Sequence, residues 1–159
     1  MIQFATAADV SMLLARVRSH AAQYSELVLC SPFIDDDVLS TLREFAQRGP
    51  DVGCGVEIIT ATPTFNRIIA SGGMQGCYRT RIIGCPHLHA KFYLARSRRT
   101  ALTEAIVTSA NLTTPGLTSN IELGVRVTPT TPHGCVLFNQ VERFARRLTS
   151  NRSIQWKRQ

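Results

Sequence analysis

The sequence predicts an α/β fold in which a mixed central β-sheet is covered by helices on both faces. Segments with helical spacing of apolar residues stand at both ends and in the middle, and segments with strand character lie between them. The 159 residues, 44% hydrophobic and 18% charged, also have the size and composition of one globular domain. We therefore expect a single domain over residues 1–150 and a polar, basic, loosely held tail over 151–159.

Four segments have the apolar stripe and the end signals of helices. Asp9 and the run Asp35–Asp37 are acidic residues of the kind that begin helices. Gly49-Pro50 and Gly72-Gly73 are signals for helix ends. These patterns predict helices over residues 9–17, 35–45, 65–70 and 136–148.

The strand segments are short and apolar and are bounded by turn residues. Two of them are joined by the basic turn RSRRT, and two prolines in residues 128–133 predict a linker to the last helix. Strands are predicted over residues 27–30, 56–60, 78–83, 88–95, 101–109 and 121–127.

Charge points to a polyanionic partner. Eighteen Lys and Arg residues face eleven Asp and Glu residues, which gives a net charge of +7. Nucleic acid is the first candidate and an anionic membrane surface the second, with a generally solvated surface as the ordinary alternative. The chain has no apolar run long enough for a transmembrane helix and no basic N-terminal segment typical of a secretory signal. We therefore expect a cytoplasmic protein that does not engage a membrane.

The five cysteines form no CxxC pair, and without an export signal we expect reduced, mostly buried thiols. Cys77, Cys85, His87 and His89 lie close in sequence, but their spacing fits no standard zinc finger or ribbon. The sequence therefore predicts no metal site and no cofactor.

Five polar residues have a spacing that favours chemistry on a phosphate. His89 and Lys91 are two apart on one predicted strand, and Ser109 and Asn111 are two apart at the end of the next. Residues so spaced share a face, and neighbouring strands lie about 4.8 Å apart, so with Glu122 they are expected to converge. An imidazole attacks phosphorus, an ammonium, a hydroxyl and a carboxamide hold anionic oxygens, and a carboxylate orients the imidazole.

The same residues resemble the signature of a known family. His-Ala-Lys in LHAKFYLA, Ser-Ala-Asn in IVTSANLT and the Glu of NIELGV are similar to the HxK…SxN…E pattern of the phospholipase D superfamily. The nuclease branch, with small stand-alone endonucleases and metal-independent restriction endonucleases, is the most similar in appearance. The resemblance is densest over residues 87–127, and the SPFID segment upstream is similar more weakly.

This resemblance implies a phospholipase D-like fold and a catalytic set of His89, Lys91, Ser109, Asn111 and Glu122, with no metal. One position departs from the pattern, because Arg96 stands where the full motif has an Asp. In the family that Asp supports structure away from the phosphate. The ordinary alternatives are His89 as a strand histidine, Ser109 and Asn111 as turn residues, and Glu122 as a surface residue beside Arg126.

The family's reaction uses two HxK motifs, and this chain has one. The chemistry needs a nucleophile on one side of the phosphate and a proton donor on the other. We therefore expect a C₂ homodimer with one shared site between two His89 side chains. The resemblance implies that one His89 forms a phosphohistidine while the partner subunit's His89 protonates the leaving oxygen. Lys91, Asn111 and Ser109 would hold the phosphate oxygens, and Glu122 would orient the imidazole.

Five arginines are candidates for nucleic-acid contacts. Arg79 and Arg81 alternate on a predicted strand, where they either contact a nucleic-acid backbone or form an exposed sheet face. Arg96, Arg98 and Arg99 lie in the predicted hairpin turn and are expected close to the site, as phosphate contacts.

The function predicted from these observations is a metal-independent phosphodiesterase that cleaves DNA or RNA, most simply an endonuclease. One alternative is a nucleic-acid-binding module that has kept the pocket and lost turnover. A phospholipid phosphodiesterase is a weaker alternative, because the sequence shows no apolar entry surface or anchor. No DNA-reading motif is recognisable, so cleavage is either non-specific or guided by a separate specificity partner.

Overall fold

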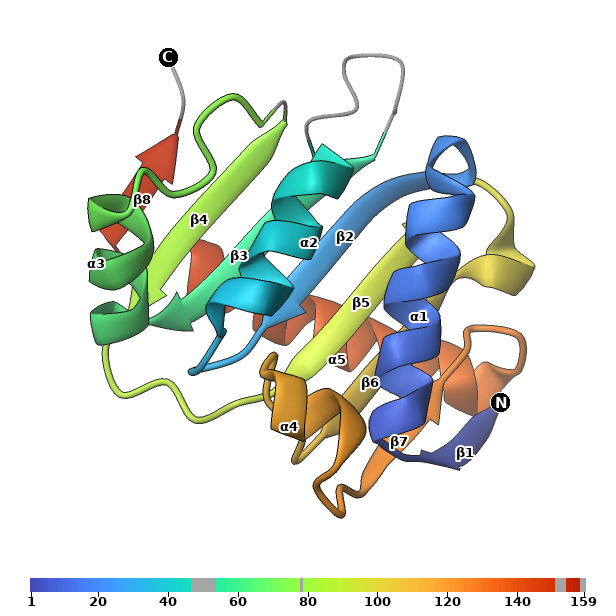
Figure 1. The fold of residues 1–159 in the computed structure, drawn as a ribbon. Helices are drawn as coiled ribbons and strands as arrows, with labels where there is room; N and C mark the ends of the chain where they lie inside the picture. The colour runs from blue at the N-terminus through green and yellow to red at the C-terminus, as the bar shows by residue number, and fades with distance from the viewer. Residues whose placement is uncertain (47–53, 78, 151–153, 158–159) are drawn as a thin grey trace.

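The computed structural model contains one eight-stranded mixed sheet with helices on both faces, which confirms the predicted α/β class (Figure 1). The structure describes residues 1–46, 54–77, 79–150 and 154–157. The strands, in chain order, are β1 Ile2–Ala5, β2 Tyr24–Cys30, β3 Gly55–Ala61, β4 Thr80–Cys85, β5 Phe92–Ser97, β6 Glu104–Thr108, β7 Gly124–Val127 and β8 Ile154–Lys157. Their order in the sheet is β1-β7-β6-β5-β2-β3-β4-β8.

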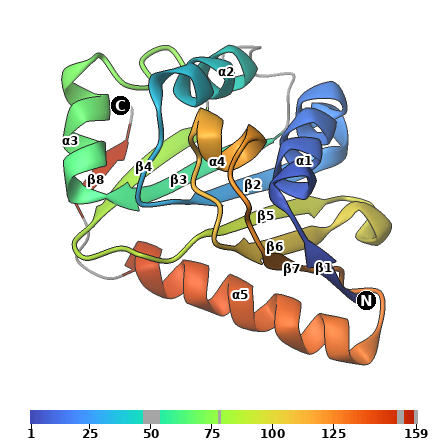
Figure 2. The same ribbon diagram turned by 60° about the horizontal axis from the view of Figure 1, so that its bottom comes forward.

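The helices divide unequally between the two faces of the sheet. Of the helices that the structure describes, the long helix α5 lies alone on one face, and the others lie on the opposite face (Figure 2). Each face has its own apolar core, because residues that alternate along a strand point to opposite faces. The helices are α1 Ala7–Ser19, α2 Asp36–Ala46, α3 Thr62–Ala70, α4 Thr114–Thr118 and α5 Pro132–Ser150, with 3₁₀ turns η1 Ala21–Gln23 and η2 Thr100–Leu102.

The directions of the strands decide which strand ends lie side by side. β2, β3 and β4 run parallel and are connected by α2 and α3, whereas β5 lies antiparallel to both β2 and β6. As a result the C-terminal ends of β2 and β6 and the N-terminal ends of β5 and β7 lie along one edge of the sheet. We call this edge, with residues 31–35, 87–91, 109–112 and 120–123, the site edge.

Local signals define the helix starts, with one correction. Asp9 was expected to cap α1, but the N-cap is Thr6, and Asp9 occupies the third helical position. The Asp9 carboxylate accepts hydrogen bonds from the Thr6 backbone N–H at 2.8 Å and from the Thr6 hydroxyl at 3.0 Å. This reciprocal arrangement is a capping box, which satisfies N–H groups that the first turn leaves free.

Several strands are shorter than predicted, and two were not predicted. β5 begins at Phe92 rather than residue 88, β6 at Glu104 after η2, and β7 at Gly124. The edge strand β1 pairs with β7, and β8, from the tail expected to be loose, pairs with β4. Edge strands form by pairing with a neighbour that is distant in sequence, so a local pattern indicates them poorly. The predicted helix end at Gly49-Pro50 and strand start at Tyr78 lie outside the described residues.

The packing of α3 on β4 provides a test of this fold. A Cβ atom added at Gly84 would lie 2.9 Å from the Phe65 ring, a closer approach than side chains make. We expect Gly84→Ala to lower the free energy of unfolding by about 1–3 kcal/mol, the usual cost of overpacking a core. Chemical denaturation measures the change. Gly55→Ala is the matched control, because its Cβ would find only ordinary contacts at 3.7 Å or more; equal losses in the two variants would contradict the packing.

Candidate active site

The segment that follows β2, residues 31–35, is held at the site edge by hydrogen bonds from other elements. Ser31 is fully buried at its start. Thr60 and Thr64 donate hydrogen bonds to the carbonyl of Pro32 at 3.2 and 2.8 Å, and Arg67 donates to the carbonyl of Ile34. These bonds come from β3 and α3, so the parallel half of the sheet holds the SPFID segment in place.

His89 and Lys91 lie in the segment just before β5, and not within the strand as predicted. The pairing nevertheless reaches Lys91, because its carbonyl accepts a hydrogen bond from the Thr108 N–H at 3.1 Å. The His89 side chain is exposed and that of Lys91 is half-buried. The Lys91 ammonium donates to the carbonyl of His89 at 3.3 Å.

Ser109 and Glu122 meet across the ends of β6 and β7. The Ser109 hydroxyl donates a hydrogen bond to the Glu122 carboxylate and accepts one from the Leu123 N–H at 3.2 Å. The second Glu122 oxygen accepts a hydrogen bond from the Asn120 amide at 3.2 Å. Among the residues that the structure describes, no hydrogen bond joins Glu122 to His89, so the predicted carboxylate–imidazole pair is not formed within one chain.

Arg126, the alternative neighbour expected for Glu122, bonds to a different carboxylate. The Arg126 guanidinium donates to Glu104, a carboxylate on β6 that is almost fully buried, and Arg16 of α1 donates to the same group. Arg126 therefore belongs to an ion-pair network with Arg16 and Glu104 at the start of β6, the end away from the site edge.

Asn111 is held by buried groups beneath it. The Ser31 hydroxyl lies 3.5 Å from the Asn111 side-chain oxygen and accepts a hydrogen bond from the Leu112 N–H at 3.0 Å. The Tyr93 hydroxyl donates to the carbonyl of Ala110 at 2.7 Å. Burial raises the pKa of the Tyr93 phenol well above its ordinary value, so it is a neutral donor.

The fold thus brings all five predicted residues to the site edge. Lys91, Ser109 and Glu122 lie just outside the ends of the successive antiparallel strands β5, β6 and β7, and Asn111 follows Ser109 beyond the end of β6. His89 and Ser109 are exposed and the other three are half-buried, so the arrangement is open to solvent. Chemically, it offers an imidazole, an ammonium, a carboxamide and a hydroxyl paired with a carboxylate, which is a set suited to holding and attacking a phosphate.

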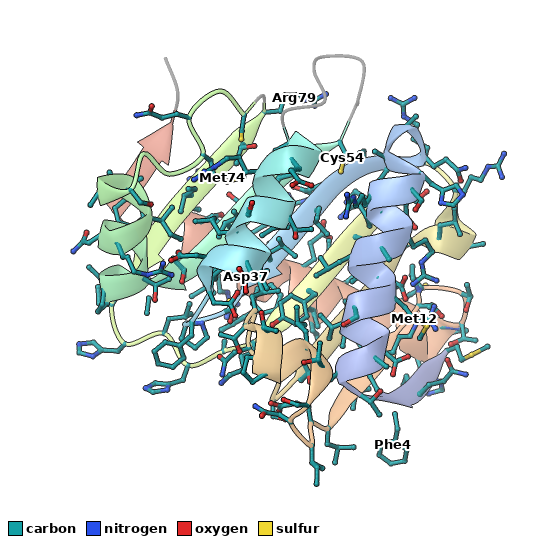
Figure 3. All side chains as sticks on the ribbon, viewed as in Figure 1. Phe4, Met12, Asp37, Cys54, Met74 and Arg79 are labelled. Carbon is teal, nitrogen blue, oxygen red and sulfur yellow. The ribbon has the colours of Figure 1, made fainter. Side chains whose placement is uncertain are left out.

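The arginines do not lie where the sequence predicted. Arg96, Arg98 and Arg99 are at the far end of β5, about 17 Å or more from Lys91 for five or more extended residues. The hairpin turn after a strand lies at the opposite edge from the strand's start, so the expectation of a basic cluster close to the site was wrong. Figure 3 shows Arg79, just before β4, at this same far edge.

Two of these arginines form ion pairs under α5. Arg96 pairs with Glu142 of α5 and with Glu26 at 3.5 Å, and its guanidinium lies 5.9 Å from the centre of the Phe138 ring. Arg81 pairs with Glu57 at 3.1 Å. The charged side chains of these ion pairs line a cavity of about 570 Å³ between the sheet and α5. Burial raises the pKa of the Glu57 carboxyl, against the opposing effect of Arg81.

Arg81 is thus neither on an exposed sheet face nor at the site edge. The position where the family pattern has an Asp is occupied by Arg96, whose role here is to attach α5 to the sheet. The residue that departs from the pattern, Arg96, therefore takes part in packing between the sheet and α5, at a distance from the candidate site.

The cysteines and histidines of the zinc hypothesis are not brought together. Cys77 belongs to the core on the α1–α4 face and Cys85 to the core on the α5 face. Within the described part of the chain, no group of three or more His, Cys, Asp or Glu side chains is arranged to hold a metal ion. None of the described helices has the length and apolar character needed to cross a membrane.

Comparison with known proteins identifies the fold. No protein-family model matches the sequence, and no curated protein does. NucT from Helicobacter pylori matches in structure with a TM-score of 0.64 at 12% identity, covering 98% of this chain and 99% of that one. Nuc from Salmonella typhimurium, a phospholipase D family member, matches with a TM-score of 0.62 at 14% identity, covering 99% of both chains.

The same fold occurs in a protein of another kind. Polyphosphate kinase from Porphyromonas gingivalis matches with a TM-score of 0.64 at 14% identity over 96% of this chain, which spans 23% of the kinase. The chain therefore has a phospholipase D-like fold, and over its whole length it is built like NucT and Nuc. Because one fold hosts several activities, the function has to be argued from the site.

The sequence pattern did not indicate the groups that support the site. Ser31, Tyr93 and Asp35 contact the segment after β6, although they are distant from it in the chain. The SPFID segment, which contains Ser31 and Asp35, resembles the family weakly, and this similarity is the signal that the sequence offers. Which segment they contact depends on the pairing of β2 with β5 and so is a tertiary property.

Asp35 links α2 to α4 and makes a pH-dependent contribution to stability. Its carboxylate accepts hydrogen bonds from the Val38 N–H at 3.0 Å and from the Thr114 N–H. Burial alone would raise the pKa of this carboxyl, but these backbone N–H groups, together with the Thr114 hydroxyl and the charge of Arg67, outweigh it and the pKa is lowered.

We expect Asp35→Asn to reduce the free energy of unfolding at pH 7 by about 1 kcal/mol, as for loss of a charged helix cap. A lowered pKa stabilises the fold above the ordinary Asp pKa, near 4, and this stabilisation is lost as pH falls through the native value. The difference between wild type and variant should therefore shrink between about pH 5 and pH 2. Denaturation curves across this range measure it. Asp37→Asn, an exposed carboxylate in the same turn, is the control; a difference independent of pH would contradict the assignment.

Proposed function

We propose that this chain is a metal-independent phosphodiesterase that cleaves nucleic acid in a site shared by two copies of the chain. The observation that carries the proposal is the gathering of His89, Lys91, Ser109, Asn111 and Glu122 at one solvent-open edge of a phospholipase D-like fold. Two structures that match over the full chain are NucT and a phospholipase D family member, Nuc.

The proposal of a shared site follows from what one chain supplies. In-line displacement at phosphorus needs a nucleophile on one side and a proton donor on the other. One chain presents a single His89 on an exposed edge, so a two-fold axis through that edge would provide the second imidazole from the partner. Lys91 and Asn111 would then act from both copies.

In the first step, a ring nitrogen of His89 forms a bond to phosphorus and the bond to the leaving oxygen breaks. The partner subunit's His89, protonated, gives its proton to that oxygen. In the second step the partner subunit's His89, now neutral, takes a proton from water. The oxygen of the water forms a bond to phosphorus as the phosphorus–nitrogen bond to the first His89 breaks. Lys91 and Asn111 stabilise the charge on the non-bridging oxygens.

Glu122 and Ser109 act in this scheme as a pair. The Ser109–Glu122 hydrogen bond fixes the serine hydroxyl at the edge, where it donates to a phosphate oxygen or stays with the carboxylate. Contact between Glu122 and an imidazole, which the family resemblance implies, stays a prediction. Because the cationic and amide groups are numerous, the scheme assigns no role to a metal ion.

Nucleic acid is the substrate class favoured by the net charge of +7. The five candidate arginines, residues 79, 81, 96, 98 and 99, lie far from the site edge, so their charge acts mainly as a general field that attracts a polyanion. Arg98 and Arg99 are exposed at the far edge and are available for backbone contacts beyond the reacting phosphate. A separate specificity partner remains part of the proposal, as does a location in the cytoplasm.

A nucleic-acid-binding module without turnover is the second candidate. The observation that favours it is Arg96 in place of the motif Asp. The ion pairs of Arg96 with Glu142 of α5 and with Glu26 of β2, far from the site edge, weigh against a loss of activity from this cause.

The first test is cleavage of plasmid, single-stranded DNA and RNA in excess EDTA. We expect cleavage by the wild type and losses of at least about 1,000-fold in His89→Ala and Lys91→Ala, since each removes a group that acts on the phosphate. His133→Ala, an exposed histidine at the start of α5, is the control and should keep full activity. A phosphorylated adduct trapped on His89 would support the mechanism. Undiminished turnover in His89→Ala would refute it, and binding without cleavage would favour the second candidate.

The second test concerns the shared site. We expect a molar mass in solution of twice the 17.6 kDa of one chain. When His89→Ala is mixed with wild type and the subunits are allowed to exchange, activity should fall below that of the diluted wild type, because mixed dimers lack one imidazole. Light scattering and a titration of activity measure these properties. A monomer with full activity would contradict a shared site.

A further inference from the structure

We propose that Ser31 and Tyr93 are positioning residues that fix the Ala110–Leu112 backbone, so that the Asn111 carboxamide faces the reacting phosphate. This inference rests on the proposed function and extends it to two residues that are distant in sequence from Asn111. Both side chains are fully buried, so neither reaches the substrate, and any effect they have on turnover passes through the segment that they hold.

Ser31 supports Asn111 from the end of β2. Its hydroxyl oxygen accepts the Leu112 N–H at 3.0 Å, and its proton goes to the Phe33 carbonyl at 2.7 Å or to the Asn111 side-chain oxygen at 3.5 Å. A proton given to that oxygen leaves the amide N–H₂ of Asn111 free to donate to a phosphate oxygen. The bond to Leu112 fixes the residue next to Asn111 in either case.

Tyr93 supports the same segment from β5. Its hydroxyl donates to the Ala110 carbonyl at 2.7 Å inside the core. The Ala110 carbonyl lies beyond the end of the β6 ladder, so without this donor it would be a buried acceptor with no strand to pair with. Tyr93 thus fixes the peptide between Ala110 and Asn111, next to one of the residues proposed to act on the phosphate.

The remaining side of the segment is closed by α4 and the SPFID segment. The Asp35 N–H donates to the Leu112 carbonyl at 3.1 Å, and Ile34 forms a parallel bridge with Leu112. A Cβ atom added at Gly116 would lie 2.6 Å from the Asn111 carbonyl oxygen, which shows how closely the helix approaches. Asn111 is therefore surrounded by fixed groups on its inner side and open on its outer side.

This arrangement matters for catalysis because electrostatic stabilisation depends on donors that are already in place. Displacement of a reacting or stabilising group by about 1 Å typically costs on the order of 100-fold in rate. Loss of the Ser31 or Tyr93 hydroxyl would release part of the Ala110–Leu112 backbone and leave the ladders of β5 and β6 intact. The expected defect is thus local to Asn111.

The experiment measures kcat and KM for Tyr93→Phe and Ser31→Ala on a p-nitrophenyl phosphodiester in EDTA. We expect kcat to fall by about 10- to 100-fold, with a much smaller change in KM. Tyr24→Phe is the matched control, because Tyr24 is also fully buried but its hydroxyl lies beside Arg16 and Glu104. Its kcat should remain that of the wild type, whatever its loss of stability.

Double variants separate positioning from general destabilisation. In an Asn111→Ala background, Tyr93→Phe and Ser31→Ala should lower kcat little further, because the group that they position is already gone. Equal fold losses with and without Asn111 would overturn the inference, as would kcat values for Tyr93→Phe and Ser31→Ala that match the Tyr24→Phe control. An inactive wild type would remove the proposed function itself, whereas an active wild type with unaffected variants removes this inference alone.

Discussion

The antiparallel insertion of β5 between β2 and β6 is the constraint on which the candidate site depends. Pairing of Cys30 with Phe92 and of Phe92 with Val107 places the end of β2, the start of β5 and the end of β6 side by side. A parallel β5 would send Lys91 to the opposite edge of the sheet. Ladder hydrogen bonds therefore do more than stabilise the sheet, because they set the distances among the groups proposed to act on phosphate.

The groups proposed to act on phosphate and the candidate arginines lie at opposite edges of the sheet. The site edge has an imidazole, an ammonium and a hydroxyl–carboxylate pair, and its charged residues, Lys91, Asp35 and Glu122, give it no excess of positive charge. The far edge has the five candidate arginines, and two of them, Arg81 and Arg96, are paired with Glu26, Glu57 and Glu142 under α5. Because paired charges contribute little field at a distance, the net charge of the chain says more about a polyanionic partner than about its path on the surface.

The candidate site is built in two layers. The outer layer contains the groups that face solvent, and the inner layer contains buried hydroxyls that satisfy backbone groups beyond the strand ends. Strand ends are where ladders stop, so carbonyl and N–H groups there need other partners. Ser31 and Tyr93 meet this need and at the same time limit the movement of Asn111.

The sequence by itself determined the α/β class, most element positions and the five candidate residues, because apolar periodicity and residue spacing are local properties. It did not determine that His89 and Lys91 precede their strand, that Glu122 bonds to Ser109, or that Arg96 anchors α5. Nor did it indicate β1, β8 or the support of Asn111 by Ser31 and Tyr93. Those features depend on which strands pair and on the ends at which chain segments meet, and only the tertiary structure decides contacts between residues that are far apart in the chain.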